Sequence, residues 1–165
     1  MRPQDESGYR LNLARGYFAE AEEDIKRKRW RSCAASAQFS IENSAKAIIA
    51  CFVPVAITHD PAVQLARLIE TETMPEEVAA KAREIIPIAA KFGGKEHGLF
   101  SYGDTKRFRD PWSLVTQCWK LDVGSWKLDC QTFQPLISNL QLISRRFSGG
   151  KINVQIYRCR RHPRR

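Results

Sequence analysis

The sequence has little that would support a metal centre, a disulfide framework or a membrane span. It holds five cysteines that never form a C-x-x-C pair, and three histidines in 165 residues. Cysteines odd in number and set among apolar residues are more typical of buried thiols than of disulfides or zinc ligands. No apolar run approaches the roughly 20 residues that span a bilayer. We therefore expect no metal, no cofactor and no contact with a membrane.

The N-terminal segment also lacks the apolar core of a secretory signal, which favours a cytoplasmic protein. With 165 residues, 43% of them hydrophobic, the chain is long enough to bury one domain core.

Positive charge is in excess and unevenly placed. Six of the nine net positive charges lie in residues 150–165, which contain no acid, and three in residues 1–149. The sequence thus predicts a domain over residues 1–149 and a basic C-terminal arm over 150–165. A second basic cluster, Lys26–Arg31, includes Trp30. Cations beside an aromatic ring suit phosphate contact and base stacking, while a solvated helix end is the alternative.

Helical periodicity extends over most of the chain. Apolar residues at helical spacing predict helices over residues 8–28 and 31–52, joined by a turn short enough to make them antiparallel neighbours. Asp60-Pro61 is read as the capped start of a third helix, and Pro75 with two glutamates as the start of a fourth. Pro87 should kink that helix, and Gly93-Gly94 should end it.

The remainder is predicted as a long loop over residues 93–110, a helical turn opening at Asp110-Pro111, and a last helix over 125–147 kinked at Pro135. An extended arm is expected after Gly150 in preference to a strand. The resulting fold class is all-α: an up-and-down bundle of four to five helices with kinked later helices and a basic C-terminal arm.

The segment 31–52 is the most informative part of the sequence. It has no glycine or proline, and Ala34, Ala37, Ala45 and Ala47 alternate with bulky apolar residues. Small residues at helical spacing let neighbouring helices approach closely. A central helix is therefore expected, packed on at least two sides and retaining a polar stripe. The surplus of small residues also suggests that this helix forms a dimer interface.

A pattern in this helix resembles the HEPN domain. Residues 37–47 read A-x-x-S-x-E-N-x-A-K-A, Thr58-His59-Asp60 follows, and the segment 100–104 resembles the family's Arg-Tyr-Pro-Asp stretch. The resemblance implies an all-helical bundle that usually dimerises. It also implies that the chain binds or cleaves RNA, or is the partner of a small nucleotidyltransferase in a toxin–antitoxin pair.

The sequence departs from the catalytic members of that family, in which an Arg lies four to six residues before a His. Here Lys91 precedes His97 at the required distance, and Ser101 replaces the Arg expected before Tyr102. A lysine offers a point charge in place of a bidentate fork. The sequence therefore favours a binding module over an enzyme. The alternatives are a metal-independent ribonuclease using His97 as acid or base, and a non-catalytic helical scaffold.

Two groups of residues are predicted to form the functional site. The loop 93–110 is expected to bind RNA or a nucleotide, because long loops in compact domains tend to carry function. Its members are Lys95, His97, Tyr102, Asp104, Lys106, Arg107 and Arg109. The second group is the helical stripe Glu42, Asn43 and Lys46. The competing interpretations are a surface ion pair for Glu42 and Lys46, a helix-entry role for His59, and an Asx turn for Asp104.

Overall fold

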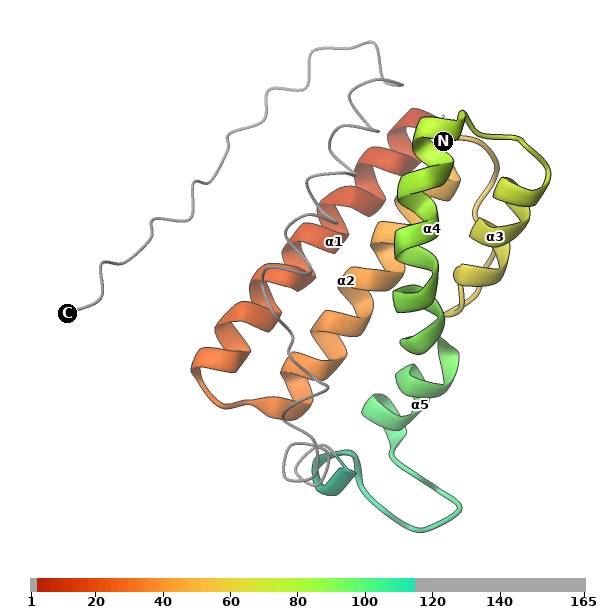
Figure 1. The fold of residues 1–165 in the computed structure, drawn as a ribbon. Helices are drawn as coiled ribbons and strands as arrows, with labels where there is room; N and C mark the ends of the chain where they lie inside the picture. Colours follow the sequence, from red (N-terminus) through yellow and green to blue (C-terminus); the bar gives the residue numbers. More distant parts are fainter. Residues whose placement is uncertain (1–2, 115–165) are drawn as a thin grey trace.

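The computed structural model describes residues 3–114, and most residues in that range are helical. Helix α1 spans Pro3–Lys26 and α2 spans Trp30–Ala50. They form an antiparallel hairpin whose helices lie side by side (Figure 1). The two predicted helices are thus confirmed, with α1 beginning five residues earlier than predicted. The helix predicted over 125–147 and the basic arm over 150–165 lie outside the described residues.

Helix α2 is the centre of the bundle. It contacts α1 and all three later helices. Every residue from Ser40 to Ala50 is buried, and the fully buried Ile41, Ile48 and Ile49 supply its largest apolar side chains. The prediction of a central helix packed on at least two sides is confirmed. Four helical neighbours also account for its many small residues, since Ala37, Ala45 and Ala47 are buried within the chain itself.

Two serine hydroxyls and one asparagine amide link α1 to α2 across the hairpin. The Ser40 hydroxyl donates to the Ala14 carbonyl over 2.9 Å, and the Ser7 hydroxyl donates to the Ala47 carbonyl over 2.9 Å. Asn43 faces the same way, because Arg10 donates to its Oδ1 over 3.4 Å. Buried hydroxyls cost free energy unless they are paired. These bonds fix the register of α1 on α2.

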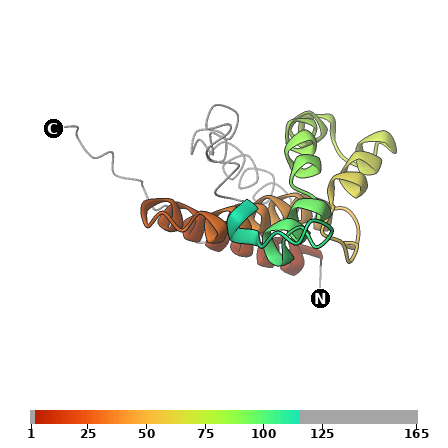
Figure 2. The same cartoon turned by 90° about the horizontal axis from the view of Figure 1, so that it is seen from below.

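Helices α3 (Ala62–Glu70) and α4 (Glu76–Lys91) lie on one side of the hairpin (Figure 2). Both starts agree with the sequence within two residues, but the predicted cap of α3 is wrong. Pro61 occupies the cap position, its carbonyl accepts from the Leu65 amide, and no side chain caps the helix. Pro87 lies inside α4, which continues to Lys91.

The loop predicted over residues 93–110 is partly wrong, because the structure places a fifth helix there. Helix α5 spans Gly94–Tyr102 and packs against α2. Its sequence carries two glycines and a weak apolar periodicity, so propensity and pattern both argued for a loop. Packing against α2 decides the outcome, as tertiary contacts often do for short helices.

The described part of the chain is all-α, as predicted. It contains five α-helices, one isolated bridge between Asp104 and Arg109, and a helical turn at residues 111–114. Among residues 3–114, no helix combines the length and the apolar character needed to cross a bilayer.

Overfilling the centre of α2 tests this packing. Ala45 is fully buried, so Ala45→Leu is expected to lower the free energy of unfolding by about 1–3 kcal/mol through steric strain. Ala80→Leu is the matched control, because Ala80 is an exposed alanine inside α4. Urea denaturation of both variants measures the difference. Equal midpoints would show that the packing around Ala45 accommodates a larger side chain without strain.

Candidate functional site

Three polar side chains form a line along α2, one turn apart. Gln38, Glu42 and Lys46 are all buried, and they point away from the hydrogen bonds made to α1. Lys46 Nζ lies 2.7 Å from Glu42 Oε1, and Gln38 Nε2 donates to Glu42 Oε2 over 3.0 Å. The sequence pointed to a surface ion pair as the default for Glu42 and Lys46. The structure shows a buried one.

The connection from α2 to α3 brings His59 to this line. Gln64 holds the connection by donating to the Pro54 carbonyl over 2.8 Å and accepting from the Ala56 amide over 3.0 Å. His59 Nδ1 then lies 3.1 Å from Glu42 Oε2. The His59 side chain is 51% exposed, whereas that of Glu42 is 5% exposed. A buried carboxylate thus positions an accessible imidazole.

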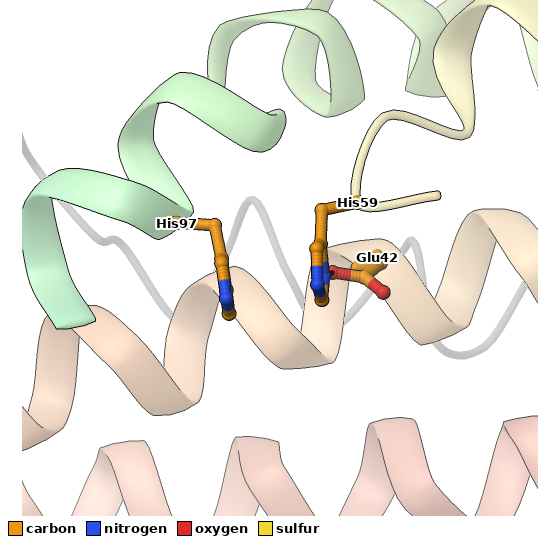
Figure 3. Close-up of side chains that lie close together, drawn as sticks. All are labelled: Glu42, His59 and His97. Atoms are coloured by element: carbon orange, nitrogen blue, oxygen red, sulfur yellow. Dashed lines mark hydrogen bonds and ion pairs between the residues drawn. The ribbon is translucent and has the colours of Figure 1, made fainter. Parts of the chain in front are cut away.

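Helix α5 brings the second histidine to the same place. His97 Nδ1 lies 3.3 Å from Gln38 Oε1, and its ring stacks on His59 with centroids 3.8 Å apart and planes 8° from parallel (Figure 3). Gly93 permits this approach, because a Cβ there would lie 3.2 Å from Asp60 Cγ. A side chain at Gly93 would therefore crowd Asp60, the residue after His59.

The hydrogen bonds determine where each ring carries its proton. A carboxylate only accepts, so Gln38 turns its amide nitrogen to Glu42 and leaves its carbonyl oxygen for His97. His97 Nδ1 must then carry a hydrogen, and His59 Nδ1 carries one for Glu42. When the rings are neutral, each Nε2 holds a lone pair. That pair can accept a proton or bind a metal ion.

Charge and burial set the protonation of the cluster. Burial raises the pKa of Glu42, but hydrogen bonds from Lys46, His59 and Gln38 outweigh it and hold that pKa below its ordinary value. The pKa of His97 is also lowered, first by burial and then by the nearby His59, against the attraction of Glu42. At neutral pH, Glu42 is thus ionised and His97 neutral.

Comparison with known protein families gives one match. The family described as HEPN domain matches residues 8–91, which is just over half of the chain. The chain belongs to the HEPN domain family. Neither the comparison with curated proteins nor that with solved structures gives a match. The resemblance inferred from the sequence is confirmed, and membership identifies a helical module of RNA- or nucleotide-related function.

The matched region of the HEPN domain runs from α1 to the end of α4. It includes Glu42, Lys46 and His59, while His97 and the residues after it lie beyond the match. Any role for His97 and the later residues is therefore argued from the structure of this chain and not from the family match.

The later residues of the predicted loop 93–110 lie in an exposed segment that we call the aromatic turn, residues 102–112. Tyr102 is 75% exposed, Phe108 is 95% exposed and Trp112 is 62% exposed. Lys106 and Arg107 are exposed between them. Aromatic faces beside cations are the usual elements of a surface that binds single-stranded nucleic acid.

The aromatic turn has a defined backbone. Gly103 ends α5 with a φ of 83°, and a Cβ at this position would clash with the Arg109 carbonyl. Asp104 and Arg109 exchange backbone hydrogen bonds of 2.8 and 3.0 Å. The Asp104 carboxylate accepts from the amides of Lys106 and Arg107 over 3.1 and 3.2 Å, which makes the Asx-type turn considered for it.

Arg31 ties the aromatic turn to the start of α2. Its Nε donates to the Phe100 carbonyl over 3.0 Å, and its guanidinium lies 5.5 Å from the centre of the Trp112 ring. The basic cluster Lys26–Arg31 therefore lies at the same end of the molecule as the aromatic turn (Figure 1). Much of its charge is already paired, since Glu23 binds Lys26 and Arg27, and Asp24 binds Arg29.

The structure thus divides the predicted site residues among four places. Glu42 and His97 belong to the cluster with His59, and Lys46 is paired with Glu42 beside it. Asn43 faces α1, and Lys95 is exposed on α5. The other members, Tyr102, Asp104, Lys106, Arg107 and Arg109, belong to the aromatic turn. Gln38 was not among the predicted site residues, and His59 was given a helix-entry role in preference to a site role. Gln38 had a usable signal, its position four residues before Glu42, whereas His59 is brought in only by the fold of a loop.

Proposed function

We propose that this HEPN domain binds single-stranded RNA through the aromatic turn. The main support for this proposal is the conformation of Phe108, whose side chain is 95% exposed and whose backbone has a φ of 51°. A non-glycine residue at positive φ costs roughly 1–2 kcal/mol, and exposure of a phenyl ring gains nothing in the free protein. Strain and exposure at one residue of an ordered turn indicate a ligand contact.

Charge around the aromatic turn supports this proposal. Lys106 and Arg107 directly precede Phe108 on a backbone that Asp104 holds in place. The ion pair of Arg107 with Asp104 is long, 3.8 Å, and its side chain is 76% exposed. An exposed pair of that length is worth little, so the guanidinium can turn to a phosphate. Stacking on the rings and phosphate contact by the cations can then act together.

The salt dependence of RNA affinity tests the two cations. Each phosphate contact to a single strand contributes about 0.7 to the slope of log affinity against log salt. Lys106→Ala combined with Arg107→Ala should therefore reduce that slope by about 1.4, measured by fluorescence anisotropy with an oligouridylate in EDTA. Arg67→Ala combined with Arg83→Ala is the control, because it removes equal charge from exposed positions on α3 and α4.

The outcome also separates the alternatives. An unchanged slope in the Lys106 and Arg107 variant would move the RNA contact away from the aromatic turn. Cleavage of the RNA in EDTA that disappears in His97→Ala would select the ribonuclease in place of the binding module. No cleavage with intact binding is the result that the proposal expects.

Partnership remains a separate proposal. We infer from family membership that the domain forms a homodimer and pairs with a nucleotidyltransferase of the toxin–antitoxin type. The small residues of α2 suggested a dimer interface, but Ala37, Ala45 and Ala47 are buried by other parts of the same chain. They therefore give no support for a dimer formed through α2. A dimer would have to use another surface, such as the one around the exposed Ile57 and Val63.

A further inference from the structure

The cluster of Glu42, His59 and His97 has a second chemical capacity. One ligand atom from each residue lies within 4.8 Å of the others. The three residues come from α2, from the connection before α3, and from α5 (Figure 3). Two imidazoles and one carboxylate are a ligand set that binds first-row transition metals, with room for an exogenous ligand. We propose that these three residues form a site for a zinc-class divalent ion.

The donor atoms follow from the hydrogen bonds. Glu42 Oε1 is held by Lys46, so Oε2 is the oxygen that faces the histidines. The ion would take the place of the hydrogen bond between Oε2 and His59 Nδ1, and the ring proton of His59 would move to Nε2 through solvent. His97 keeps its hydrogen on Nδ1 for Gln38 and presents Nε2 to the ion. Gln38 then orients the ligand, as outer-shell groups do in metal sites.

Metal binding must open the histidine stack. An ion binds an imidazole in the plane of its ring, and two parallel rings 3.8 Å apart share no such position. Ligand atoms around a tetrahedral zinc ion are about 3.3–3.5 Å apart, which is closer than the 4.8 Å limit of the cluster. His59 is the ring that can rotate, because its side chain is 51% exposed and comes from the connection before α3. Binding of the ion by both histidines therefore requires His59 to leave the stack.

Lys46 limits how tightly the ion is held. Its ammonium neutralises Glu42, so the two imidazoles and the carboxylate bind the ion against one nearby positive charge. We expect an affinity on the order of micromolar for Zn²⁺ and Co²⁺. Magnesium and calcium should not bind, because they prefer sites built from oxygen ligands.

Metal titration of the full chain tests the site. The protein is stripped with EDTA, dialysed and titrated with Zn²⁺ by calorimetry and with Co²⁺ by visible absorption. The wild type should bind one equivalent at the cluster, and both His59→Ala and His97→Ala should bind at least tenfold more weakly. His162→Ala is the control, since His162 is the remaining histidine of the sequence. Because His59 is half-exposed, its alanine variant is expected to fold, and circular dichroism verifies this.

Three results would overturn the proposal. They are no binding by the wild type, equal affinity in a folded His59→Ala variant, and a thiolate charge-transfer band in the cobalt spectrum, which would assign the metal to cysteine. Because the RNA measurements are made in EDTA, failure of the metal site and failure of the aromatic turn are distinguished. RNA binding without metal binding would contradict the metal site and leave the proposal for the aromatic turn unaffected.

Discussion

Lys46→Met is expected to lower the free energy of unfolding by about 3–5 kcal/mol at pH 7. The substitution keeps the volume of the side chain but removes the ammonium that lies 2.7 Å from Glu42 Oε1. Glu42 then remains as a buried carboxylate with one oxygen unpaired. Urea denaturation in EDTA measures the loss. Lys95→Met is the control, because Lys95 is exposed on α5 and its loss should cost less than about 0.5 kcal/mol.

The loss should also depend on pH with a definite sign. In the wild type, the pKa of Glu42 lies below its ordinary value of 4.5, so the contribution of its ionised form is present above that pH and is lost as the pH falls through the folded pKa. Without Lys46, its hydrogen bond and its charge no longer lower the pKa of Glu42, so the folded pKa is higher in the variant than in the wild type. The difference in free energy of unfolding between the wild type and Lys46→Met should therefore be greatest at neutral pH and become smaller on acidification. A deficit independent of pH would indicate lost packing instead.

Phe108→Asn is expected to weaken RNA binding by about 1–3 kcal/mol, which is a factor of roughly 5 to 150. The stability of the free protein should not fall with it. Asparagine tolerates the positive φ at this position far better than phenylalanine does, and the ring is 95% exposed. Weaker RNA binding without a loss of stability is the result expected for a residue that contacts the ligand. A residue that merely holds the turn would lose both.

Glu72→Asn is the matched control for this experiment. Glu72 is also exposed at positive φ, 52°, but it lies between α3 and α4. The substitution relieves the same kind of strain and removes one negative charge, so RNA affinity should stay equal or rise slightly. Anisotropy titrations of both variants give the comparison. Equal affinities of Phe108→Asn and the wild type would remove the aromatic turn from the binding surface.

Strong helical patterns were sufficient to predict the hairpin and α4. The segment 31–52 has no breaker and alternates small with bulky residues, so its identity as the central helix followed directly. Helix α5 was not predictable in the same way. Its residues have weak periodicity, and contact with α2 stabilises it. Local pattern fails where a short helix depends on a distant surface.

The candidate site shows the same division. Glu42 and Lys46 were identifiable from their spacing, but the burial of the pair was not, because burial depends on how the connection before α3 and α5 cover α2. The contact of His59 with His97 joins residues that are far apart in the sequence. Spacing along one helix is visible in a sequence, and proximity created by loops is not.

The unequal burial of α2 and the aromatic turn has a consequence for how this domain can diversify. A change in α2 disturbs several neighbours at once, since every residue from Ser40 to Ala50 is enclosed. The rings at Tyr102 and Phe108 project from a turn whose shape is set by Gly103 and the Asp104–Arg109 bridge. Substitutions in the aromatic turn can thus change ligand preference without changing the packing of the helices.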